Sequence, residues 1–138
     1  AMNRIDLQRI AEERARDAEA LLAAGQWSGA YYLAGYAVEC GLKARIARQI
    51  GQHEFPDKEL TQRCYTHNID KLIEVANLGA ARAVDMAANP IRGRYWLVVK
   101  DWNEAARYQI WLEKDARDLV NAVMDPSNGV LPWITGHW

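Results

Sequence analysis

The chain has 138 residues, of which 50% are hydrophobic and 25% are charged, with 17 Lys and Arg against 18 Asp and Glu. This length favours a single domain, residues 1–138, with Ala1 before Met2 taken as a remnant of cloning. A net charge of −1 excludes the strongly basic surface that drives non-specific binding to nucleic acids.

The two cysteines, Cys40 and Cys64, and the three histidines do not form a pattern of paired ligands. We therefore expect reduced thiols in a cytoplasmic protein, without a disulfide framework, a metal site or a cofactor. No apolar run is long enough to cross a bilayer, so we also expect no membrane partner.

The first half of the chain predicts two long helices. Residues 3–24 place apolar side chains on one face, and Gly25 is suited to end this helix. Either Gln26 or Ser28 opens the second helix, which can continue to Gly51 because no proline interrupts it.

The second half predicts shorter helices. Residues 51–65 have the composition of a loop, and Thr66 is the expected N-cap of a third helix that Gly79 closes. A short helix follows over residues 80–89, and Pro90 is suited to the first turn of the next one.

The last long helix is expected over residues 109–125, and "DPSNG" at 125–129 is a turn. The aromatic tail, residues 130–138, is expected to dock back on the body of the protein. Connections of a few residues favour antiparallel neighbours, so the fold class is an all-α bundle.

One face of the second helix carries mostly small side chains. Small residues let another backbone approach closely, so this face should form the tightest contact in the bundle. Its members are Ala30, Leu33, Ala34, Ala37, Gly41 and Ala44.

The opposite side of the same helix carries Tyr32, Tyr36, Glu39 and Lys43. Glu39 precedes Lys43 by four residues, the favourable order for an ion pair, and on an exposed face such a pair stabilises by only about 0.2–0.5 kcal/mol. On a helix that is apolar all round, the same pair indicates a pocket or a polar interface. We expect Glu39 to be largely buried and to meet Lys43 or a basic group near Arg107.

His67, Arg107 and Tyr108 complete the candidate ligand-binding or polar-interface site. His67 is either a side chain satisfied locally or against the second helix, or a group that meets a ligand. Arg107 can clamp a phosphate or carboxylate with two hydrogen bonds, or pair with Glu104 or Glu39. The sequence contains no glycine-rich phosphate loop or nucleophile–base motif, so no catalytic residue is assigned.

The six tryptophans divide into two expected groups. Aromatic residues at helical spacing usually lie in the core, and the other three tryptophans are better candidates for an interface. The core group is Trp27, Trp96 and Trp111, and the interface group is Trp102, Trp133 and Trp138. The apolar tail and the small-residue helix together predict a homodimer. Stacking on nucleic-acid bases is an alternative that the missing basic surplus disfavours.

The segment "WSGAYYLAGYAVECGLKARI", residues 27–46, resembles the second-helix signature of HEPN domains. These are small helical bundles found beside nucleotidyltransferases and in toxin–antitoxin systems. Three further segments agree in order, "THNIDKL" at 66–72, "WNEAARY" at 102–108 and "GVLPWITGHW" at 129–138. The resemblance implies an antiparallel up-and-down bundle of about four to six helices and a partner protein such as a nucleotidyltransferase.

Many HEPN proteins are metal-independent ribonucleases, marked by an Arg and a His that four to six residues separate on a late helix. After Arg107 and Arg117 no His occurs before His137, and the literal match at Arg48 and His53 lies at the end of the second helix. This departure favours a binding or regulatory module, acting with a partner protein or a small phosphorylated ligand, over an enzyme. The alternative is a ribonuclease toxin with an atypical active site.

Overall fold

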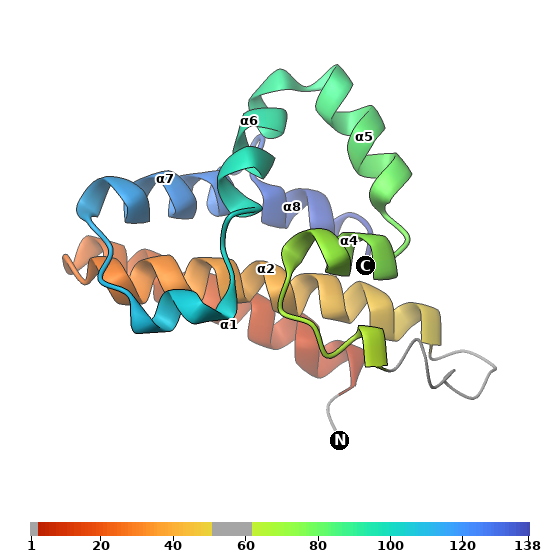
Figure 1. Ribbon diagram of the computed structural model, residues 1–138, viewed down its shortest axis with the longest axis horizontal. Helices are drawn as coiled ribbons and strands as arrows, with labels where there is room; N and C mark the ends of the chain where they lie inside the picture. The colour runs from red at the N-terminus through yellow and green to blue at the C-terminus, as the bar shows by residue number, and fades with distance from the viewer. Residues whose placement is uncertain (1–2, 51–61) are drawn as a thin grey trace.

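The computed structural model describes residues 3–50 and 62–138 (Figure 1). Within these residues the protein is all-helical, as the sequence predicts, and no strand is present. Of the helices described there, none is long and apolar enough to cross a membrane. The elements are α1 (Arg4–Ala23), α2 (Trp27–Ile50), α4 (Ile69–Val75), α5 (Gly79–Ala88), α6 (Pro90–Val99), the 3-10 helix η1 (Glu104–Tyr108), α7 (Glu113–Met124) and α8 (Val130–Thr135).

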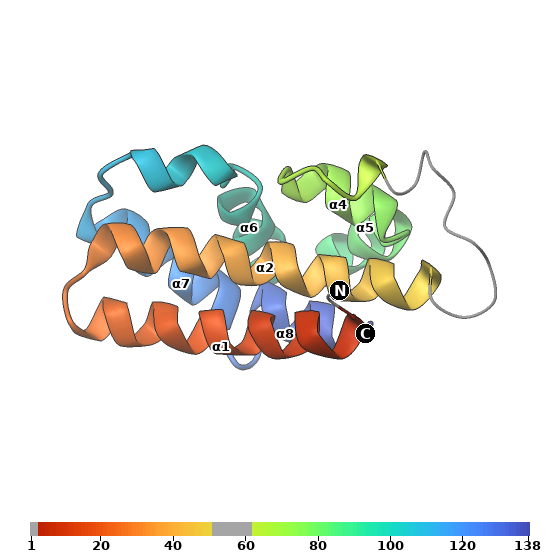
Figure 2. The ribbon, with the colours of Figure 1, turned by 90° about the horizontal axis from the view of Figure 1, so that it is seen from below.

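Helix α2 is the centre of the structure. In Figure 2, α1 runs along one side of it and η1 and α4 along the other, with α7 and α8 behind. The turn between α1 and α2 contains Gly25 at φ 77°, a left-handed conformation that glycine adopts without steric cost. The predicted end of the first helix at Gly25 is therefore confirmed.

The small-residue face of α2 packs on α1, as predicted. Three alanines of α1 and four of α2 lie in this antiparallel contact and are almost completely buried, and it is the most extensive contact between two helices in the described residues. Side chains of one methyl group bring the helix axes close together, which explains why so polar a helix as α1 stays attached. The alanines are Ala11, Ala15, Ala18, Ala30, Ala34, Ala37 and Ala44.

The boundaries of the third predicted helix were wrong at both ends. The N-cap of α4 is Asn68, whose side chain accepts a hydrogen bond from Lys71 N at 3.0 Å, while Thr66 Oγ1 accepts one from Asn68 N at 3.1 Å. Asparagine caps helices at least as well as threonine, so the later residue prevails. Asn77 at φ 60° ends the helix, and Gly79 instead opens α5.

The last long helix begins at Glu113, four residues later than predicted. The N–H of Trp111 donates to Ser28 Oγ at 2.9 Å, and the Asp115 carboxylate accepts from Leu112 N at 3.3 Å. These bonds hold residues 109–112 outside the helix, so Ile110, assigned to the helix from its spacing, is 92% exposed.

The C-terminal segment packs against α2, in agreement with the predicted docking on the body, and forms a helix, α8, that periodicity did not reveal. Arg45 donates to the carbonyl of His137 at 2.8 Å, and the indole N–H of Trp138 donates to the carbonyl of Gly41 at 3.0 Å. Trp138 therefore contacts its own chain, although the sequence analysis assigned it to a subunit interface.

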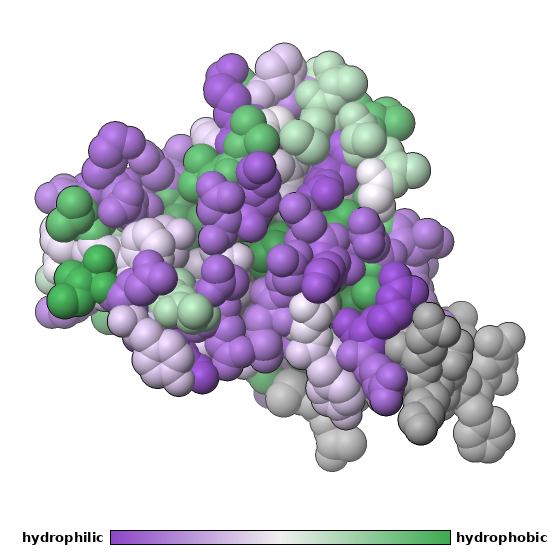
Figure 3. All heavy atoms as spheres, viewed as in Figure 1, coloured by the Kyte–Doolittle hydropathy of each residue, from purple (hydrophilic) through white to green (hydrophobic). Residues whose placement is uncertain are grey.

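Helices α5 and α6 form a hairpin that rises from the layer of α1, α2, α7 and α8 (Figure 1). Pro90 occupies the first turn of α6, as expected, and Trp96 is buried. On the face shown in Figure 3, hydrophobic atoms gather over α5, where Val84 is exposed, while the centre of this face is hydrophilic.

Candidate functional site

Glu39 lies in the middle of α2 with 3% of its surface exposed, and it is the only charged residue among the buried residues of the described chain. Lys43 Nζ lies 3.3 Å from Glu39 Oε2, one helical turn away. The prediction of a largely buried Glu39 that meets Lys43 is confirmed. The alternative of a pair on a solvated face is wrong, because η1 and α4 cover this side of α2.

His67, which precedes α4, joins two carboxylates from different parts of the chain. Its Nδ1 lies 3.0 Å from Glu39 Oε1, and its Nε2 lies 2.8 Å from Glu104 Oε2 on η1. Donation to both acceptors requires a proton on each ring nitrogen. Of the two readings of His67, the side chain satisfied against the second helix is the one that the structure supports.

Arg107 extends this chain of charges to the surface. Its NH1 lies 2.9 Å from Glu104 Oε1, and its guanidinium stands over the ring of Tyr108 at 4.8 Å. Of the two carboxylates considered as partners of Arg107, Glu104 is the one that it contacts. Five ionisable groups in successive contact thus form what we call the charge network. Its members are Lys43, Glu39, His67, Glu104 and Arg107.

The predicted tyrosines border the charge network on the side of α2 and η1. The rings of Tyr32 and Tyr36 stack with centroids 6.0 Å apart, and Tyr32 lies 5.8 Å from the ring of Trp102. Tyr108 is 78% exposed at the end of η1. All seven predicted site residues therefore lie along one continuous strip of α2, η1 and the segment before α4.

Trp102 is buried, although the sequence analysis assigned it to an interface. Its ring packs over Gly35, where an added Cβ would come within 2.3 Å of three ring atoms. A glycine in α2 thus makes the space that takes this ring into the core. The packing also fixes the start of η1, since Asn103 follows Trp102 directly and caps η1 through Ala105 N at 2.8 Å.

The pKa values of the neighbouring groups argue against an activated nucleophile in the site. Burial raises the pKa of the Cys40 thiol to about 11. The charge of Cys40 and burial raise the pKa of Tyr36 to about 12. Both groups therefore stay protonated near neutral pH and are weak nucleophiles.

Two contributions to the site were missed in the sequence. Glu104 was considered only as a partner of Arg107, whereas it also holds His67. Gly35 was not singled out, although it admits Trp102. A glycine four residues before the lone carboxylate Glu39, on the same helix face, was the available signal for close packing at this point.

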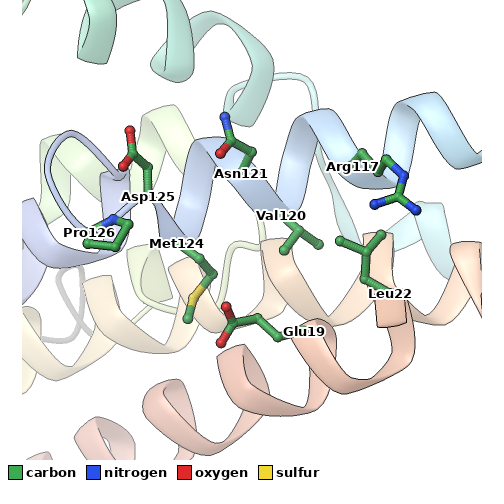
Figure 4. A pocket seen from close by; sticks show the side chains of 8 residues that line it. All are labelled: Glu19, Leu22, Arg117, Val120, Asn121, Met124, Asp125 and Pro126. Carbon is green, nitrogen blue, oxygen red and sulfur yellow. The ribbon is translucent and has the colours of Figure 1, made fainter. Parts of the chain in front are cut away.

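A hollow between α1 and α7 is a weaker candidate (Figure 4). Arg117 points along α7 at one end of it, and Asp125 lies at the other. These groups already have partners, because Arg117 pairs with Glu113 at 2.6 Å and Asp125 accepts from the hydroxyl of Tyr95 at 3.0 Å. Glu19 also lines the hollow and makes no ion pair within the described residues, so the hollow offers a ligand a single carboxylate of this kind.

Comparison of the chain with protein-family models, with curated proteins and with solved structures gives no match. No group of three His, Cys, Asp or Glu side chains in residues 3–50 and 62–138 could hold a metal ion. The histidine of the Arg48–His53 pattern lies outside the described residues.

Proposed function

We propose that this chain is a HEPN-like binding and regulatory module without catalytic activity of its own. The observation that supports this most is the position of His67 between two carboxylates. Both ring nitrogens of His67 already contact a carboxylate oxygen of the protein, which leaves neither of them free to approach a substrate hydroxyl. The group best suited to general-base chemistry is thus occupied by the fold itself.

The proposed ligand group is a phosphate, carried by a small molecule such as a nucleotide. Arg107 and Tyr108 present an exposed cation beside an exposed aromatic ring. A hydrogen bond with Tyr108 and the nearby Glu104 carboxylate raise the pKa of Arg107, so its charge is constant. A guanidinium can accept a phosphate through two hydrogen bonds, and the phenol ring can pack against a base.

The proposed partners are a second copy of the chain and a nucleotidyltransferase. Trp102 and Trp138 pack within their own chain, so two of the three tryptophans expected at an interface do not support a homodimer. What supports it is a set of large apolar side chains on the surface, including Leu97, Ile110 and Leu112. Light scattering that gives the mass of one chain at high protein concentration would contradict the dimer.

Titration with adenosine 5′-monophosphate and with inorganic phosphate, followed by calorimetry, tests the ligand. We expect Arg107→Met to abolish saturable binding and Arg107→Lys to weaken it, since lysine cannot form the two-pronged contact. Arg9→Met, on the exposed face of α1, is the matched control and should bind like the parent protein. Equal binding by Arg107→Met and the parent would contradict the proposal.

Incubation of the purified protein with RNA tests the alternative, a ribonuclease toxin with an atypical site. We expect no cleavage above a buffer control, because none of the described residues is placed to activate a ribose hydroxyl and stabilise the developing phosphate charge. Cleavage that His67→Ala or His53→Ala abolishes would show that the module is an enzyme.

A further inference from the structure

A pocket of about 380 Å³ lies where α2, the end of α6 and the start of α7 meet. It is separate from the charge network, and its volume is in the range of small-molecule sites. The pocket combines an aromatic pair with three carboxylates, and we call it the acidic pocket. The aromatic pair is Tyr31 and Trp111, and the carboxylates belong to Asp101, Asp115 and Asp118.

The aromatic wall of the acidic pocket is rigidly held. The rings of Tyr31 and Trp111 stack with centroids 3.7 Å apart and an interplanar angle of 16°. The indole N–H of Trp111 donates to the carbonyl of Ala106 at 3.0 Å, and its backbone N–H donates to Ser28 Oγ. Aromatic rings held in this way offer a preformed surface to a cation or an alkyl chain.

Tyr31 gives an independent indication that the pocket receives a polar group. Its side chain lines the pocket, and the residue is only 6% exposed. Its hydroxyl makes no hydrogen bond to any group within residues 3–50 and 62–138. Burial raises the pKa of Tyr31, and the negative charges of Asp115 and Asp101 raise it further. The hydroxyl oxygen is not among the buried polar atoms without a partner, so it keeps access to solvent, and a ligand in the pocket can replace water as its partner.

The three carboxylates are unequally compensated. Asp118 pairs with Lys114 at 2.7 Å. Asp115 accepts only from the backbone N–H of Leu112, which leaves its charge in place. Asp101 makes no ion pair within the described residues. Two negative charges therefore remain beside an apolar wall.

We propose that the acidic pocket binds an aliphatic diamine. Two ammonium groups match the two uncompensated carboxylates, and the alkyl chain between them matches the apolar surface of Leu97, Val98 and Trp111. The hydroxyl of Tyr31 accepts a hydrogen bond from one ammonium group. The lysine side chain of another protein has the same ammonium and alkyl chemistry but only one charge. Titrations with a free diamine and with a lysine derivative therefore distinguish the two kinds of ligand.

The test is an NMR titration of the full-length ¹⁵N-labelled chain with 1,4-diaminobutane at low salt, followed at the indole N–H of Trp111. We expect saturable shifts that 1,4-butanediol does not produce, because the diol has the same length and no charge. Nα-acetyl-lysine amide should bind at least several-fold more weakly than the diamine. Equal binding of the diol overturns the role of charge, and equal or tighter binding of the lysine amide overturns the diamine as the ligand.

Three variants and a control locate the site. Asp101→Asn should weaken binding about ten-fold or more, since one charge-assisted hydrogen bond is lost. Tyr31→Phe should weaken it to a smaller extent. Lys114→Met should strengthen binding, because it frees Asp118 from its ion pair. Glu74→Gln, which removes an exposed carboxylate from α4, should leave it unchanged. An Asp101→Asn protein that folds and binds like the parent overturns the proposal.

Discussion

Helices α2 and α5 are stabilised in different ways. Half of the 24 residues of α2 are buried, whereas none of the 10 residues of α5 is buried. α2 is held on several sides by packed side chains, so a polar group within it must find partners or destabilise the fold. α5 lies at the edge of the molecule, where most polar groups meet water at little cost. Asp85 is the exception in α5, because its side chain is only 18% exposed and pairs with Arg92 at 2.6 Å.

The ion pairs of the two regions differ accordingly. Arg82 of α5 pairs with Asp70 at 2.7 Å and stands over the ring of Trp96 at 5.1 Å, and both charges keep access to solvent. Glu39 of α2 is buried, and its contacts with Lys43 and His67 offset the free energy lost when its carboxylate leaves water. The same kind of contact should therefore stabilise the two regions to different extents, which the following variants test.

The largest effect is expected for Glu39→Gln. This substitution removes a buried charge that two cationic or donor groups share, and it should lower the free energy of unfolding by about 2–4 kcal/mol. Glu39→Leu combined with Lys43→Met should recover part of the loss, because an apolar pair leaves no charge unpaired. Urea denaturation measures both.

The control for Glu39 is Glu74→Gln on the exposed side of α4, with an expected change of less than about 0.5 kcal/mol. A double-mutant cycle of Glu39 with Lys43 gives their coupling energy. A coupling energy of zero would place this pair with the weak surface pairs and remove the distinction between α2 and α5.

A smaller loss is expected for Gly35→Ala. The added Cβ would meet the ring of Trp102 at 2.3 Å, and overpacking of a core costs about 1–3 kcal/mol. Gly79→Ala is the matched control in α5, where nothing lies within 4 Å of an added Cβ. The free energy of unfolding of Gly79→Ala should be unchanged or higher by up to about 1 kcal/mol, because alanine lowers the entropy of the unfolded chain. Equal changes in thermal unfolding for the two variants would contradict the difference in packing.

Arg82→Met should have a weaker effect again. The ion pair with Asp70 is half exposed, so its loss together with the contact to Trp96 should cost about 1 kcal/mol or less. The loss should shrink when the salt concentration rises to 1 M, since salt screens exposed pairs. An Arg82→Met protein that loses as much stability as Glu39→Gln would mean that α5 is as tightly integrated as α2.

The helical fold could be predicted because apolar periodicity and small-residue faces are local properties. The error at the start of α4 came from a choice between two local caps, whereas the error at the start of α7 has a tertiary origin. Trp111 is held out of the helix by Ser28, which lies 83 residues earlier, so no local pattern records it. Tertiary hydrogen bonds of this kind decide where a helix begins when two start positions are otherwise similar.

In the candidate site, too, the contacts within one helix could be predicted, and the contacts between distant segments could not. The pair of Glu39 and Lys43 follows from their spacing on one helix, and its burial follows from the apolar neighbours. The bridge from Glu39 through His67 to Glu104 joins three segments that only the tertiary fold brings together. Trp102 was expected at an interface, and its burial depends on the missing side chain at Gly35, which the local pattern around Trp102 does not reveal.

The smallest effect is expected from His137, which lies between the two regions. Burial and the positive charge of Arg45 on α2 lower the pKa of His137, while Asp85 on α5 raises it. Because the pKa is lower in the folded state than in the unfolded state, the unfolded chain binds more protons as the pH falls through about 6.5. The contribution of His137 to the free energy of unfolding is therefore fully present above this pH and is lost as the pH falls below it. His137→Asn should remove this part of the pH dependence.

The size of the His137 effect is limited by its partial exposure, so the parent protein and His137→Asn should diverge by less than about 0.5 kcal/mol between pH 7.5 and 5.5. Urea denaturation at four or five pH values within this range measures the difference. The Asp85→Asn variant sharpens the assignment, because loss of the α5 carboxylate should lower the pKa of His137 further and enlarge the divergence. A parent protein that gains stability relative to His137→Asn as the pH falls would mean that Asp85, and hence α5, outweighs α2 at this position.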